Sequence, residues 1–130
     1  MKNVLLIDDD PDDAMFFSDA LAELNLSTSF RYIGSGTETM PELLKADGYV
    51  PDVIFLDINM PITNGWECLR ELKSLAEFKR IPIIMYSTAD IENEGMVASD
   101  VGASAFMRKP SNFAELKARL AGIIRNMFSS

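Results

Sequence analysis

Several short apolar runs of this chain end in side chains that could carry out phosphate or metal chemistry. They are Asp8 and Asp9, Asp57, Ser87 and Lys109, at the ends of four different runs. Three carboxylates that converge on one point repel one another by roughly 4 kcal/mol for each pair about 4 Å apart, so a proton or a cation must join them. Mg²⁺ prefers oxygen ligands and binds through carboxylates together with phosphate oxygens. A lysine adds a compact positive charge, and the set therefore indicates a site for Mg²⁺ and a phosphate group.

Each residue of this kind also has a purely structural explanation. Asp10, Asp12 and Asp13 are interpreted as a capping residue and dipole partners at the start of a helix. Ser87 by itself would indicate a turn residue, and Lys109 by itself a solvated lysine. Convergence favours the functional interpretation, because four apolar runs end in groups that serve one chemistry.

Short β-rich runs alternate with longer amphipathic segments along the chain. The pattern predicts strands at 4–7, 27–33, 53–56, 83–86 and 105–107, and helices at 11–24, 37–46, 66–75, about 92–101 and 113–127. Asp10 and Pro11 are expected to begin the first helix. The second helix is predicted despite Pro41, which would be tolerated only in its first turn. Five strands alternating with five helices predict an α/β fold with a doubly wound parallel sheet. The functional site of such a fold lies beyond the carboxyl ends of the strands.

The composition excludes several classes of protein. The chain has no histidine, which rules out His-based triads and His-liganded metals, and its single cysteine, Cys68, rules out an internal disulfide. The net charge of −8 disfavours direct binding to nucleic acid. No apolar run approaches the ~18 residues of a membrane span, and the start of the chain lacks the features of a signal peptide. We therefore expect a cytoplasmic protein that binds neither nucleic acid nor membrane.

Over essentially its whole length the chain resembles the receiver domain of bacterial two-component response regulators, the family that includes the chemotaxis regulator. The similar segments are LIDDD at 6–10, DINMP at 57–61 followed by Gly65, PIIMYS at 82–87 and GASAFMRKP at 102–110. Together, in this order and at this spacing, they are highly specific. The resemblance implies a flavodoxin-like sheet with strand order 2-1-3-4-5. It also implies a single receiver domain at 1–130, which we expect to be a stand-alone protein.

The resemblance implies roles for the converging carboxylates. Asp57 would be the phospho-acceptor, since a carboxylate can act as a nucleophile toward a phosphoryl group. Asp8 and Asp9 would hold Mg²⁺, Asp9 most directly. Asp57 and the backbone carbonyl of Asn59 would complete the set of metal ligands.

The resemblance also assigns side chains to contact the phosphoryl group and to transmit its arrival. Ser87 would hydrogen-bond a phosphoryl oxygen, and Lys109 would pair first with the acceptor carboxylate and then with the phosphoryl group. The peptide bond between Lys109 and Pro110 is expected to be cis. Ser87 and Phe106 would form the switch; many members have tyrosine in place of Phe106, so switching here would work by packing alone. Ala89 lies where the family varies and offers little shielding of the phosphoryl group.

The implied function is a phosphorylation-activated signalling switch of a phosphorelay rather than an enzyme. The phosphoryl donor would be a partner histidine kinase or histidine phosphotransfer protein, because this chain has no histidine of its own. Phosphorylation would change the surface that an unknown downstream protein target binds, including residues 90–95.

Two other functions compete with this one. A Mg²⁺-dependent small-molecule phosphohydrolase that forms an aspartyl-phosphate commonly has a second acid two residues after the nucleophile, where this chain has Asn59. A flavin- or nucleotide-binding module of the same strand order would need a first loop rich in Gly, Ser or Thr. The loop at 8–13 instead contains five acids, which would repel a phosphate.

Overall fold

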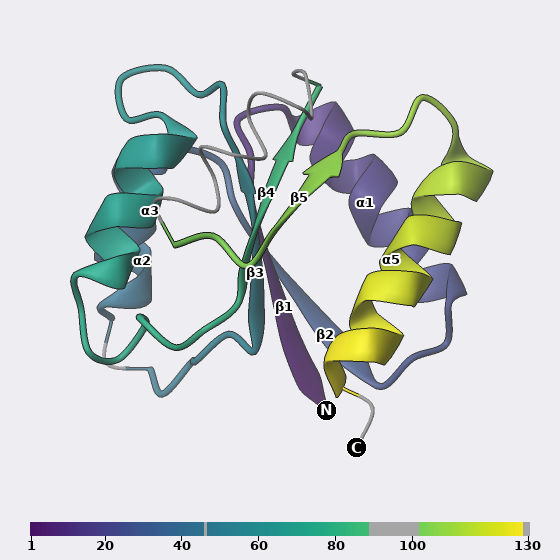
Figure 1. Cartoon of the computed structure of the whole chain (residues 1–130), viewed down its shortest axis with the longest axis horizontal. Coiled ribbons are helices and arrows are strands. Elements are labelled where there is room, and N and C mark those ends of the chain that lie inside the picture. Colours follow the sequence, from purple (N-terminus) through teal and green to yellow (C-terminus); the bar gives the residue numbers. More distant parts are fainter. Residues whose placement is uncertain (46, 89–101, 129–130) are drawn as a thin grey trace.

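The computed structural model describes residues 1–45, 47–88 and 102–128. Its strands are β1 (Lys2–Ile7), β2 (Thr28–Ile33), β3 (Val53–Asp57), β4 (Ile83–Ser87) and β5 (Ala105–Arg108), and its helices are α1 (Pro11–Glu23), α2 (Gly36–Leu43), α3 (Gly65–Lys73) and α5 (Phe113–Phe128). The strands form one parallel sheet in the order β2-β1-β3-β4-β5 (Figure 1). This confirms the predicted α/β fold and its flavodoxin-like strand order. The expected helix at about 92–101 lies outside the described residues.

Both faces of the sheet are buried by helices. In β1, Leu5 and Ile7 belong to one apolar cluster, and Val4 and Leu6 belong to a second, because successive side chains of a strand point to opposite faces. The first cluster includes residues of α2 and α3, and the second includes residues of α1 and α5, which cover opposite faces (Figure 1). Burial on both faces explains why the central strands are continuous apolar runs instead of alternating ones.

The start of α1 agrees with its prediction. The Asp10 side chain caps the helix by accepting hydrogen bonds from the backbone N–H of Asp12, at 2.9 Å, and of Asp13, at 3.4 Å. Pro11 occupies the first helical position, where a missing N–H has no cost.

Among the described residues, no helix combines the length and the hydropathy that crossing a membrane requires.

Pro41 does not lie in the first turn of its helix, where a proline would be tolerated. The helix α2 begins at Gly36, capped by the Ser35 hydroxyl, so Pro41 lies in its interior beyond the first turn. A proline there removes one backbone hydrogen bond and its ring crowds the preceding turn. The helix ends at Leu43, and not at residue 46 as predicted.

Candidate functional site

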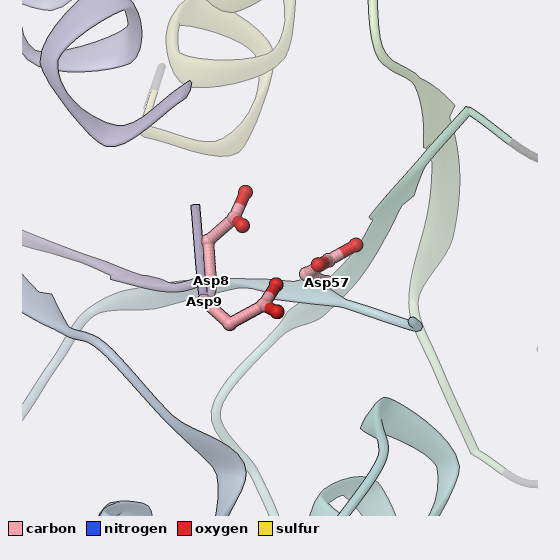
Figure 2. Close-up of side chains that lie close together, drawn as sticks. All are labelled: Asp8, Asp9 and Asp57. Carbon is pink, nitrogen blue, oxygen red and sulfur yellow. The ribbon is translucent and has the colours of Figure 1, made fainter. Parts of the chain in front are cut away.

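The carboxyl ends of β1, β3, β4 and β5 bring the predicted site residues to one edge of the sheet. Asp8 and Asp9 follow β1, and Asp57 is the last residue of β3. One carboxylate oxygen from each of these three lies within 4.8 Å of the others, and their side chains gather in Figure 2. The sequence-based expectation that these carboxylates converge is therefore confirmed by the geometry.

Burial differs among the three carboxylates. Asp8 is fully buried and Asp57 is 4% exposed, whereas Asp9 is exposed to solvent. The Asp8 carboxylate accepts a hydrogen bond from the backbone N–H of Asp10 at 2.9 Å. Burial raises the pKa of Asp8 above its ordinary value, and the hydrogen bonds from Asp10 and Lys109 oppose this effect.

Asp57 lies in an environment that disfavours its charge. Burial, followed by the nearby charge of Asp8, raises the pKa of Asp57 from 3.8 to about 7, although the charge of Lys109 acts in the opposite direction. Asp9 raises it further. The charge of Lys109 therefore does not fully compensate the negative charge of the carboxylates. Three converging oxygen donors are the ligand type that a hard divalent cation prefers.

The Lys109 ammonium lies among carboxylates from three elements. Its Nζ is 2.9 Å from Asp8 Oδ2, 2.8 Å from Asp13 Oδ2 and 3.6 Å from Asp57 Oδ1. Burial by itself would lower the pKa of Lys109, but the hydrogen bonds with Asp13 and Asp8 raise it above the ordinary lysine value. Lys109 therefore remains a cation in this site.

The contact with Asp13 was missed by sequence reasoning, which interpreted Asp13 only as a dipole partner of its helix. The signal that could have found it is the position of Asp13 in the first turn of α1, directly after the acidic strand end. The cis peptide bond expected before Pro110 is also wrong, because the described residues contain no cis peptide bond. The trans form of an X–Pro bond is favoured by about 0.5–1 kcal/mol unless the fold demands otherwise.

The hydroxyl of Ser87, at the end of β4, is buried next to the loop that follows β3. It accepts a hydrogen bond of 3.5 Å from the side-chain amide of Asn59, which is exposed. Phe106 on β5 lies opposite Met85 on β4 and is partly buried against the same apolar cluster as Met85. Because Met85 and Ser87 are two residues apart on one strand, Phe106 lies on the same face of the sheet as Ser87.

A close backbone approach shapes the loop after Asp57. A Cβ at position 65 would lie 2.2 Å from the backbone oxygen of Asp57, so only glycine fits there. The N–H of Gly65 donates to the carbonyl of Ile58 at 2.9 Å, and Asn64 begins α3 with a capping box to Glu67. These contacts position the segment that contains Asn59.

Comparison with known proteins gives one consistent result. The model of the response regulator receiver domain family matches residues 4–121. Response regulator Rcp1 of Synechocystis is 25% identical over 94% of this chain and 86% of its own length. The transcriptional regulatory protein KdpE of Escherichia coli is 32% identical over 96% of this chain, which spans only 52% of KdpE. The phosphorylated cyanobacterial phytochrome response regulator RcpA superposes with a TM-score of 0.88, with 30% identity and coverage of 98% of this chain and 94% of RcpA.

Proposed function

Since the chain belongs to the receiver domain family of two-component response regulators, we propose that it is a phosphorylation-activated switch whose acceptor is Asp57. The observation that carries the proposal is the position of Asp57, buried at the end of β3 with Asp8, Asp9 and Lys109 around it. The solved structure of RcpA, at 30% identity, is of a phosphorylated protein, which supports phosphorylation of this chain as well.

The transfer step needs positioning and charge neutralisation more than acid–base chemistry. A carboxylate oxygen of Asp57 attacks the phosphorus of a phosphohistidine on a partner histidine kinase or histidine phosphotransfer protein. The new P–O bond forms as the P–N bond breaks, and the imidazole nitrogen keeps the electron pair of that bond and takes up a proton. The donor is a partner because the chain has no histidine.

The donor set fits Mg²⁺. The carboxylates of Asp8, Asp9 and Asp57 and the backbone carbonyl of Asn59 would hold the ion, which supplies positive charge to the phosphoryl oxygens. The support for this assignment is the convergence of three carboxylate oxygens within 4.8 Å, together with the raised pKa of Asp57. Lys109 would contribute the remaining charge from the side of β5.

We assign the switch to Ser87 and Phe106. A phosphoryl group adds a charge of about −1.5 to −2 and three acceptor oxygens, and the Ser87 hydroxyl would donate to one of them. Phe106 lies on the same face and on the neighbouring strand, so a shift of Ser87 changes the packing next to its ring. The segment 90–95, where we also expect a change, lies outside the described residues. Amide chemical shifts with and without beryllofluoride should change around both residues; unchanged shifts at Phe106 would contradict this route.

The phosphohydrolase alternative is not favoured. Such an enzyme commonly has an acid two residues after the nucleophile, and here that position has Asn59, whose amide donates to Ser87. We propose instead that the chain promotes only its own phosphorylation and dephosphorylation, and that its output is the binding of a downstream protein.

The proposed function is tested by incubating the protein with Mg²⁺ and acetyl phosphate and measuring the intact mass. We expect one phosphoryl adduct on the parent protein and on Asp19→Asn, a control that removes an exposed acid of α1. Asp57→Asn should show no adduct. An adduct of equal yield on Asp57→Asn would contradict the assignment of the acceptor.

A further inference from the structure

The Lys109 ammonium makes its short contacts with two carboxylates other than the proposed acceptor. Its distances to Asp13 and Asp8 are 2.8 and 2.9 Å, whereas Asp57 is 3.6 Å away. The first two are hydrogen bonds, and the third exceeds the length of one. In this state Lys109 forms an ion pair with Asp57 without a hydrogen bond, whereas it hydrogen-bonds Asp8 and Asp13.

The two close partners of Lys109 differ in their access to water. The Asp8 side chain is fully buried, whereas the Asp13 side chain is 39% exposed. A buried carboxylate that loses its cation is strongly destabilised, but a partly exposed carboxylate is rehydrated when its ion pair breaks. Asp13 is therefore the partner that can release Lys109 at low cost.

A phosphoryl group on Asp57 would compete for the same ammonium. It has more charge than a carboxylate and three strong acceptor oxygens, and Asp57, which would carry it, already lies 3.6 Å from the Lys109 Nζ. The backbone of Asp13 is held in the first turn of α1, where its N–H donates to the Asp10 side chain. Asp13 thus holds Lys109 from the side of α1.

We propose, on the basis of the function proposed above, that Asp13 is a positioning residue that holds Lys109 on the α1 side of the site and that releases it to the phosphoryl group. Because Asp13 stabilises the unphosphorylated arrangement, it lowers the affinity of the site for a phosphoryl group. Removing its charge should raise that affinity.

The test compares the affinity of the parent and three variants for beryllofluoride, the phosphoryl mimic, with excess Mg²⁺ and fluorine NMR to observe the bound species. Asp13→Asn should bind beryllofluoride about two- to fivefold more tightly than the parent, the change expected when a partly exposed ion pair no longer competes. Asp12→Asn removes an equal charge from an exposed neighbour in the same turn, and it should change the affinity much less. Asp13→Glu keeps the charge within reach of Lys109 and should restore the affinity of the parent.

The outcomes separate this inference from the proposed function. Equal affinities of Asp13→Asn and Asp12→Asn would show that only the overall charge matters, and weaker binding by Asp13→Asn would show that Asp13 supports the phosphoryl state; either result overturns the inference and leaves the proposed function intact. A parent protein that binds no beryllofluoride and gains no phosphoryl group from acetyl phosphate would overturn both.

Discussion

Replacing Asp57 by asparagine should make the metal-free protein more stable, although it removes the proposed acceptor. Burial and the charge of Asp8 raise the pKa of Asp57 from 3.8 to about 7, so the ionised carboxylate is unfavourable in the folded state. Asparagine has nearly the same shape and no charge, and its amide can donate to the neighbouring carboxylates.

The magnitude and its pH dependence follow from linkage. The difference between 3.8 and about 7 corresponds to about 4 kcal/mol as an upper value. Because neighbouring carboxylates share part of this effect, we expect a gain of about 2–4 kcal/mol in the free energy of unfolding above pH ~7. Between the two pKa values the folded state holds a proton that the unfolded state has lost, so the stability of the parent falls as pH rises from about 4 to about 7. The advantage of Asp57→Asn should therefore be complete at about pH 8 and vanish near pH 4.

The assay is urea unfolding in EDTA at several pH values, followed by circular dichroism. Asp19→Asn is the matched control, since it removes one exposed carboxylate of α1 and should change stability by less than ~0.5 kcal/mol. Excess Mg²⁺ should stabilise the parent and narrow its difference from Asp57→Asn, because the ion binds the folded state. Ionised Asp57 does not destabilise the folded state if Asp57→Asn is no more stable than Asp19→Asn at about pH 8 in EDTA. The same conclusion follows if the extra stability of Asp57→Asn persists unchanged near pH 4.

Three further predictions concern the site and its support. Asp9→Ala should abolish Mg²⁺ binding in calorimetry while Asp12→Ala retains it, because the Asp9 oxygen lies in the carboxylate cluster; equal binding would remove Asp9 from the ligand set. Gly65→Ala should lower the free energy of unfolding by at least about 1–3 kcal/mol, since its Cβ would meet backbone atoms at 2.2 Å. Gly122→Ala, which meets nothing within 4 Å, should have no such cost in the same urea unfolding experiment. Burial raises the pKa of the Cys68 thiol to about 11, so iodoacetamide at about pH 8 should label it only after urea unfolds the chain; rapid labelling of the folded protein would contradict its burial.

Local patterns in the sequence predicted the α/β fold class and the parallel sheet, whereas the strand order came from the resemblance to receiver domains. The apolar runs 4–7 and 53–56 lack alternation because strands in the middle of a parallel sheet are buried on both faces. The Asp10–Pro11 pair identified the start of α1 because capping is decided by neighbouring residues. The edge of the sheet at which the site lies could be predicted from the fold, since parallel strands deliver their last residues to one side. Sequence therefore determined that Asp8, Asp9 and Asp57 meet.

Only the tertiary structure decided which carboxylates share Lys109. Asp8 and Asp13 are 101 and 96 residues away from it in the sequence, and no local pattern relates positions so far apart. Their distances depend on how α1 packs beside the sheet and on the direction in which β5 delivers its lysine. Spacing predicts which residues reach an edge, but the pairing of charges at that edge depends on differences of less than 1 Å, such as 2.8 against 3.6 Å, which are set by the packing of the whole domain.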